Sequence, residues 1–476
     1  MLQSKAYTHS RRTLIFGSDG LRPDLVNAEL MPTYFRLMKE GAFFRRFYSV
    51  YPSETRVAMT SFTTGVYPGR HGVVANRPYL PGFGANGYLQ TGDHRDLLAY
   101  QKQFARSLVL RPTLGDRLFA CGKHLSVAGN GSPGCNLLWN LQRPEKILNA
   151  STDYGVPELR ALHSHLGSPP QGNSFAPLEW ITKAFIQHQL PDESNAVMVL
   201  WLAQPDHSAH ATGLGSESFR KALQCVDECL AIVLRALEQR GEEINLLLLS
   251  DHGHSTIDAQ GSLETHVATA CEELKVNARA LTVSGQGIYQ IGRITDHELQ
   301  ALAHWIRDQP WCGSLYLNHP NAEEWKALPV ESLLGPVEEG RAPLVIVNPT
   351  WSPRLNKHGV MGVTQLTVND GWSTHGNAVP TDMQAFCVGW GPGFKKSYLS
   401  DIPAGIVDIA PTICHLHGLG RQGGFDGRAL HEALADGDHV PHWTSSVEGR
   451  PHQRQPLQTA QVRTTRYILG CEVHRV

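Results

Sequence analysis

Five short segments of the sequence combine aspartate, histidine and hydroxyl side chains in patterns that can do chemistry. They read FGSDG, PSETR, QPDHSAH, SDHGH and GWSTHGN, and they supply Asp19, Thr55, Asp206, His210, Asp251, His252 and His375. Carboxylates and neutral imidazoles are common ligands of divalent cations. Three aspartates, three histidines and one hydroxyl can bind two such ions and supply a nucleophile. The pattern therefore indicates a two-metal hydrolase that acts on a phosphorus ester.

Each segment on its own also has an ordinary structural explanation. Asp206 and His210 stand four residues apart, which places them on one side of a turn or short helix, but such an aspartate is also a common cap. Asp251 follows a run of leucines, and a charge at the end of a buried strand needs a partner such as a cation. Thr55 precedes a predicted helix, where free N–H groups favour an anion and where threonine also serves as a cap. Ser53 competes with Thr55 for either role.

Strands have to bring these segments together. The hydrophobic runs TLIFGSD, AVMVLWLAQPD and INLLLLSDHG end directly in three of them. In α/β sheets, ligands usually bind at the carboxyl ends of the strands. Apolar residues at helical spacing predict helices over residues 31–41, 57–65, 178–190 and 216–241. This alternation predicts an α/β fold with a largely parallel central sheet and helices on both faces.

The character of the sequence changes after His254. Up to Trp372 it contains a predicted helix near residues 296–309 but none of the metal-type segments. The core pattern returns with MQAFCVGWGPG and IVDIAPTICHLHGLG. We therefore predict a catalytic core over 1–254 and 373–476 with an inserted cap subdomain over 255–372. The tail after about residue 420 is polar and rich in Gly and Pro, and YILGCEV near its end is a candidate edge strand.

Composition narrows the class of partner. The chain has 476 residues and a net charge of −2, which does not favour a nucleic-acid polymer or a membrane surface as partner. We find no secretory signal and no apolar run near membrane-spanning length. The nine cysteines are odd in number and scattered, which favours reduced thiols and a cytoplasmic location. Homo-oligomerisation stays open.

The stretch YPSETRVAMTSFTTGVYPGRHGVVAN, from Tyr51 to Asn76, resembles the nucleotide pyrophosphatase/phosphodiesterase branch of the alkaline phosphatase superfamily. It contains a threonine at the place of the family's nucleophile, a T-G-x-Y-P turn, an H-G pair and a following asparagine. The resemblance covers roughly residues 12–135, 195–255 and 370–432. It implies an alkaline-phosphatase-like three-layer sandwich.

The resemblance also implies roles for the residues at matching positions. One zinc ion would be held by Asp206, His210 and His375, and a second by Asp19, Asp251 and His252. Thr55 matches the nucleophile, which also contacts the second metal, and Asn76 matches an amide that donates to a phosphoryl oxygen. The implied activity is that of a phosphodiesterase/nucleotide pyrophosphatase that forms a covalent phospho-threonine intermediate on a small-molecule phosphorus ester.

Arg56 departs from the family pattern, because the nucleotide hydrolases often carry an aromatic residue there that stacks on the base. An arginine at this position favours a substrate with extra negative charge, unless it is simply exposed. One alternative is therefore a phosphonate hydrolase of the phosphonoacetate type, for which Arg56 or Lys123 would bind the carboxylate. A phosphomonoesterase and a non-catalytic metal-binding relative are further alternatives.

Overall fold

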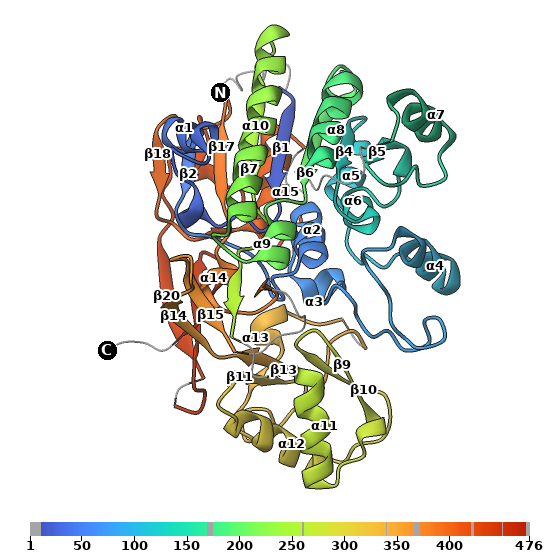
Figure 1. The fold of residues 1–476 in the computed structure, drawn as a ribbon, viewed down its shortest axis with the longest axis vertical. Helices are drawn as coiled ribbons and strands as arrows, with labels where there is room; N and C mark the ends of the chain where they lie inside the picture. Colours follow the sequence, from blue (N-terminus) through green and yellow to red (C-terminus); the bar gives the residue numbers. More distant parts are fainter. Residues whose placement is uncertain are drawn as a thin grey trace, which may run out of the picture.

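The computed structural model describes residues 11–168, 175–258, 261–338, 340–365, 372–419, 423–449 and 451–472. Figure 1 shows a larger unit of mixed sheet and helices, with a smaller unit, drawn in yellow-green, at the bottom of the view. The first ten residues, on which part of the expectation about a secretory signal rests, lie outside the described residues.

An eight-stranded sheet forms the centre of the larger unit. Its strands, in spatial order, are β18 (Tyr398–Ser400), β2 (Ala42–Phe44), β17 (Cys387–Trp390), β7 (Asn245–Leu249), β1 (Thr13–Ser18), β6 (Asn195–Leu202), β4 (His124–Gly129) and β5 (Ile147–Asn149). The strands from β7 to β5 pair in parallel, and β17 runs against both of its neighbours. The predicted largely parallel sheet is confirmed.

Side chains alternate along the central strands and build two hydrophobic layers. In β1, Leu14 and Phe16 join one layer, and Ile15 joins the other. The first layer is covered by α1 (Pro32–Glu40), α8 (Ala176–Ala184) and α10 (Glu217–Gln239). The second is covered by α2 (Thr55–Thr64), α4 (His94–Phe104), α5 (Leu114–Phe119), α6 (Pro133–Trp139) and α15 (Ile409–Leu416). Figure 1 shows α10 crossing in front of β7 and β1, and the three layers confirm the implied sandwich.

The predicted helices agree with the structure within a few residues. The largest difference is at α8, which ends at Ala184 and is followed by a π-helical turn over Phe185–Gln189. Helix α2 begins at Thr55 itself and ends before Gly65, so the candidate nucleophile lies in the first turn of the helix. The long amphipathic helix α10 has an exposed polar side and a buried apolar side. None of the helices in the described ranges is both long and apolar enough to cross a membrane.

The smaller unit has its own sheet and its own hydrophobic cluster. Its five strands, in spatial order, are β12 (Leu328–Pro329), β11 (Cys312–Leu317), β13 (Val345–Pro349), β10 (Gly287–Gln290) and β9 (Leu281–Ser284). Helices α11 (Leu263–Leu274) and α12 (Asp296–Asp308) pack on this sheet through a cluster that includes Leu299, Leu302 and Leu315. The unit lies within the predicted insertion, whose limits at 255 and 372 stay a prediction.

Two further sheets have three or more strands, and the first of them joins segments that are distant in sequence. The first contains β14 (Trp351–Leu355), β15 (Met361–Thr364), β8 (Ser255–Ile257) and β16 (Ser373–Thr374). The second is formed by β20 (Trp443–Glu448), β21 (Leu457–Val462) and β22 (Thr465–Cys471). β22 contains most of the predicted edge strand and lies at an edge. The polar tail was not expected to supply the other two strands, which are stabilised by antiparallel pairing.

Candidate metal centre and active site

The three predicted aspartates meet at one edge of the central sheet. Asp19 directly follows β1, Asp251 comes shortly after β7, and Asp206 begins α9 (Asp206–Thr212) after β6. Because β7, β1 and β6 are neighbours and run in parallel, their carboxyl ends lie side by side. All three aspartates are buried, with exposed fractions between 0 and 7%. The sheet therefore concentrates three carboxylates at one edge.

A first group of ligand atoms gathers around Asp206. His210 Nε2 lies 3.3 Å and His375 Nε2 lies 3.5 Å from Asp206 Oδ1. His254, which was not among the predicted ligands, lies closer, with its Nε2 at 2.7 Å from the same oxygen. The ligand atoms of these four residues all lie within 4.8 Å of one another. The group can hold a divalent cation.

A second group is formed by Asp19, Asp251 and His252. His252 Nε2 lies 3.3 Å from Asp251 Oδ2 and 3.5 Å from Asp19 Oδ1. The hydroxyl of Thr55 extends this group, because its Oγ1 lies 3.2 Å from His252 Nε2 and 3.4 Å from Asp19 Oδ1. The rings of His252 and His375 stack with centroids 3.7 Å apart, so the two groups are adjacent. The structure thus brings all seven predicted residues of the metal set together.

Backbone carbonyls fix which nitrogen of each predicted histidine faces the cluster. The Nδ1 atoms of His210, His252 and His375 lie 2.8 to 2.9 Å from the carbonyl oxygens of Ser373, Gly253 and Ser53, respectively. Nδ1 must carry the proton for these hydrogen bonds. In the neutral imidazole each Nε2 is then left with a lone pair that points toward the carboxylates, as a metal ligand requires.

The electrostatics of the second group fit a cation. Burial, reinforced by the charges of Asp251 and Asp206, raises the pKa of Asp19 well above its usual value. Burial also raises the pKa of Asp251 to about 7. Asp251 Oδ2 is fully buried and has no hydrogen-bond partner in the described part of the chain. A divalent cation between these oxygens would relieve both the desolvation and the repulsion.

In the first group, imidazoles surround the single carboxylate of Asp206. Burial opposes ionisation of Asp206, but its interactions with His210 and His254 hold its pKa well below the usual value. Burial lowers the pKa of His210 and the charge of Asp206 raises it, and the net shift is upward. Burial lowers the pKa of His252 and His254 to about 4, and it also holds the pKa of His375 well below its usual value. These three imidazoles are therefore neutral near pH 7, the state in which histidine binds a metal.

His254 is the residue that the sequence analysis missed. Its Nε2 binds Asp206 directly, and its Nδ1 lies 3.3 Å from Ser373 Oγ, so the imidazole orients a candidate ligand. Gly20, with φ +68°, makes room for it, since a Cβ at Gly20 would lie 2.9 Å from the His254 ring. A signal was available: His254 stands two residues after His252, and alternate residues of an extended segment point the same way.

The two hydroxyls that competed for the nucleophile role have different surroundings. Ser53 is fully buried, donates to the carbonyl of Asn377 at 2.8 Å and accepts from the amide of Gly376 at 3.1 Å. This serine supports the loop that carries His375. Thr55 faces both carboxylate and imidazole groups of the second group, which makes Thr55 the better candidate nucleophile.

Asn76 lies beside the first turn of α2. Its Oδ1 accepts from the backbone N–H of Arg56 at 3.2 Å, and its own N–H donates to the buried carboxylate of Glu54. Burial raises the pKa of Glu54. No described residue accepts a hydrogen bond from the side-chain amide nitrogen of Asn76, which leaves that group available as a donor to a phosphoryl oxygen.

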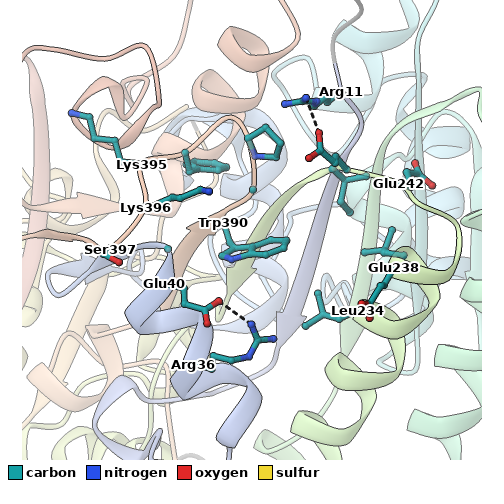
Figure 2. Close-up of a pocket in the computed structure, with 17 residues that line it drawn as sticks. Arg11, Arg36, Glu40, Leu234, Glu238, Glu242, Trp390, Lys395, Lys396 and Ser397 are labelled. Atoms are coloured by element: carbon teal, nitrogen blue, oxygen red, sulfur yellow. Dashed lines mark hydrogen bonds and ion pairs between the residues drawn. The ribbon is translucent and has the colours of Figure 1, made fainter.

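One cavity lies near the candidate site, and another lies at the opposite edge of the central sheet. A cavity of about 310 Å³ lies beside Asn76 and is lined by core residues and by residues 262–264 and 283–285 of the smaller unit. A larger cavity of about 810 Å³ lies at the amino ends of β1 and β7, far from the carboxylates. Figure 2 shows Trp390 in it beside the ion pair of Arg36 and Glu40. Lys123 precedes the amino end of β4 and donates to the carbonyl of His417, so Lys123 also lies away from the metal-type groups.

A three-layer α/β sandwich with two adjacent metal-type groups and a hydroxyl beside one of them defines the alkaline-phosphatase-like class. Residues 13–377 match the family model described as Type I phosphodiesterase / nucleotide pyrophosphatase. The chain therefore belongs to this family, as the resemblance predicted.

The individual relatives have low sequence identity to this chain. Ectonucleotide pyrophosphatase/phosphodiesterase family member 1 of Rattus norvegicus is 28% identical over 56% of this chain and 26% of its own length. Bis(5'-adenosyl)-triphosphatase ENPP4 of Bos taurus is 24% identical over 86% of this chain and 78% of its own length. The chain thus spans about a quarter of the length of the first curated relatives it matches. An inactive variant of murine ectonucleotide pyrophosphatase/phosphodiesterase 5 in complex with AMP has the same fold, with a TM-score of 0.63 and 18% identity over 89% of this chain and all of that chain.

We expect metal binding to strengthen as the pH rises through about 7. The pKa of Asp251 is raised to about 7 by burial, so at lower pH a proton competes with the cation for this carboxylate. In the metal-free protein, protonated Asp251 contributes stability that is fully present below pH 3.8, the pKa of this group in the unfolded chain. This contribution is lost as the pH rises through about 7. Zinc added to chelator-treated protein should therefore raise Tm more at about pH 8 than at about pH 6 in thermal unfolding. An equal increase at both pH values would contradict this assignment.

We expect His254→Ala to weaken metal binding by about 10- to 100-fold, because Asp206 loses the group that orients it. His254→Gln, which retains a donor, should lose less. Metal dissociation constants from chelator competition provide the measurement. His207→Ala is the matched control, since His207 lies on the same short helix but is exposed. Unchanged affinity in the folded His254→Ala protein would refute the positioning role.

Proposed function

We propose that this protein is a two-metal hydrolase of phosphorus diesters or pyrophosphates that acts through a covalent phospho-threonine at Thr55. The observation that carries the proposal is the position of Thr55 Oγ1, which lies 3.2 Å from His252 Nε2 and 3.4 Å from Asp19 Oδ1 in the first turn of α2. Family membership and the name of the bovine relative, which denotes a dinucleoside triphosphatase, support the same class of substrate.

Zinc is the proposed metal. One group offers Asp206, His210 and His375, and the other offers Asp19, Asp251 and His252, which are ligand types that suit zinc. Two bound divalent cations would supply Lewis acidity, lower the pKa of the Thr55 hydroxyl and neutralise charge on the phosphoryl and leaving oxygens.

The chain's own residues define two displacements. In the first, Thr55 Oγ forms a bond to phosphorus while the bond from phosphorus to the leaving oxygen breaks, and the hydroxyl proton passes to water. In the second, a water oxygen attacks the phospho-threonine, the bond from phosphorus to Thr55 Oγ breaks, and Thr55 regains a proton. Asn76 donates a hydrogen bond to a non-bridging oxygen in both steps. Each displacement inverts phosphorus, so the overall reaction retains configuration.

Other members of the proposed class differ in the substrate charge that they require. A phosphonate hydrolase of the phosphonoacetate type and a phosphomonoesterase would both act on substrates with more negative charge than a simple diester. The position of Lys123 removes one of the two basic side chains considered for a carboxylate, so this alternative depends on Arg56. A cytoplasmic location remains a proposal that rests on the nine scattered cysteines of the sequence.

Thr55→Ala should lower kcat by several orders of magnitude while the zinc content is retained, because the nucleophile is lost but the carboxylates and imidazoles remain. Steady-state kinetics and elemental analysis on the same preparation provide the measurement. Ser53→Ala is the control, and we expect its kcat to stay within about tenfold of the wild type because Ser53 acts through the backbone of Gly376 and Asn377. Comparable losses in the two variants would remove the basis for choosing Thr55.

The zinc-loaded wild-type protein should hydrolyse bis-p-nitrophenyl phosphate faster than p-nitrophenyl phosphate, because a diester carries the smaller charge. A preference for the monoester would move the assignment to a phosphatase. A chiral phosphorothioate diester should be hydrolysed with retention at phosphorus. Inversion would exclude the phospho-threonine intermediate.

A further inference from the structure

Arg56 is a half-buried cation next to the candidate nucleophile, and it lacks an ionic partner. Within the described residues no carboxylate forms an ion pair with its guanidinium, and its Nε is buried without a hydrogen-bond partner. The carboxylates of Glu54 and Asp19 are near enough for the charge of Arg56 to oppose the rise that burial causes in their pKa values. Arg56 thus lies within electrostatic range of the reaction centre but is not neutralised there.

A second polar group without a partner borders the same space. Ser132, immediately before α6, has a buried Oγ that caps no helical N–H and has no hydrogen-bond partner among the described residues. A Cβ placed on Gly92 would lie 3.3 Å from Ser132 Oγ and 3.8 Å from Arg56 Cζ. The absence of a side chain at Gly92 therefore lets the hydroxyl and the guanidinium both approach the same point of the backbone.

Hydrogen bonds connect this position rigidly to Asn76. Thr91 donates to the carbonyl of Asn76 through its backbone N–H at 3.1 Å and through its hydroxyl at 2.6 Å. Gly92 accepts from the backbone N–H of Gly134 at 2.9 Å, which ties the same turn to α6. The turn over residues 90–93 therefore holds Arg56, Ser132 and Asn76 in one polar wall beside the reaction centre.

Arg77, which follows Asn76, differs from Arg56 because its guanidinium contacts an aromatic ring. Arg77 is exposed, and its guanidinium stacks on the ring of Tyr88 at 4.0 Å from the centroid. Such a contact satisfies a cation without a ligand. Arg56 forms no aromatic contact of this kind among the described residues, so its charge is available for an anion. A guanidinium binds carboxylate and phosphate oxygens in a planar, bidentate geometry.

We propose that Arg56 and Ser132 bind a second anionic group of the substrate, a phosphate or a carboxylate, attached to a substituent of the phosphorus that Thr55 attacks. This inference rests on the proposed function, because it concerns the substrate of the same site. It selects diesters, pyrophosphates and phosphonates that carry a further negative charge over singly charged diesters.

Three substrates that each carry a p-nitrophenyl ester test the proposal. Bis-p-nitrophenyl phosphate carries one charge, 4-carboxyphenyl p-nitrophenyl phosphate adds a carboxylate, and bis-p-nitrophenyl pyrophosphate adds a phosphate. We expect Arg56→Gln to lower kcat/KM for at least one of the two more highly charged substrates by about 10- to 100-fold, mainly through KM. For bis-p-nitrophenyl phosphate the change should stay below about threefold. Arg56→Lys and Ser132→Ala should lose part of the discrimination.

The controls separate a specific contact from a general effect of charge. Arg77→Gln removes a positive charge next to Asn76 but should not discriminate between the substrates. Equal losses on all three substrates for Arg56→Gln, or equal discrimination by Arg77→Gln, would overturn the proposal. A loss confined to the monoester p-nitrophenyl phosphate would place Arg56 on the attacked phosphoryl group itself and would also overturn it.

A comparison of kcat/KM for the carboxylate-bearing diester and for the pyrophosphate then identifies whether the site prefers a carboxylate or a phosphate. If wild-type protein hydrolyses none of these esters, the proposed function fails independently of the anion site. In that case, calorimetric binding of 4-carboxyphenyl p-nitrophenyl phosphate to zinc-loaded wild type and Arg56→Gln protein still decides the inference. Binding weakened about tenfold or more by Arg56→Gln would support it, and equal binding would refute it.

Discussion

Mutual repulsion of buried carboxylates at the carboxyl edge of the sheet is the constraint on which the rest of the site depends. Asp19, Asp206 and Asp251 are brought together because β1, β6 and β7 are adjacent and parallel. Burial raises the pKa of Asp19 and Asp251, and one oxygen of Asp251 has no hydrogen-bond partner in the described chain. Such an arrangement is costly without cations, so metal binding and stability of this edge are coupled.

The surrounding loops determine how the imidazoles meet these carboxylates. Carbonyls of Ser53, Gly253 and Ser373 hold the Nδ1 atoms of three histidines and so direct their Nε2 atoms toward the carboxylates. His254 adds a hydrogen bond to Asp206. The ligands are therefore positioned before any metal binds, which reduces the reorganisation that binding requires.

The first turn of α2 links the reaction centre to substrate selection. Thr55 faces the second metal-type group, whereas Arg56, the next residue, faces the polar wall around Gly92. Asn76 accepts from the backbone of Arg56 and thus ties both functions to one turn. If Arg56 binds the anion as proposed, replacing this residue would alter the substrate charge that is accepted while the metal groups stay the same.

The sequence by itself determined the α/β alternation, the parallel strands and the candidate metal ligands, because hydrophobic periodicity and strand ends are local properties that short segments encode. It left Ser53 and Thr55 in competition, missed His254 and the strands β20 and β21, and considered Lys123 for the substrate. These questions depend on contacts between segments that are up to hundreds of residues apart, such as His375 with Ser53 and Lys123 with His417. Only the tertiary structure decided them, since strand pairing and loop packing set which side chains share a space.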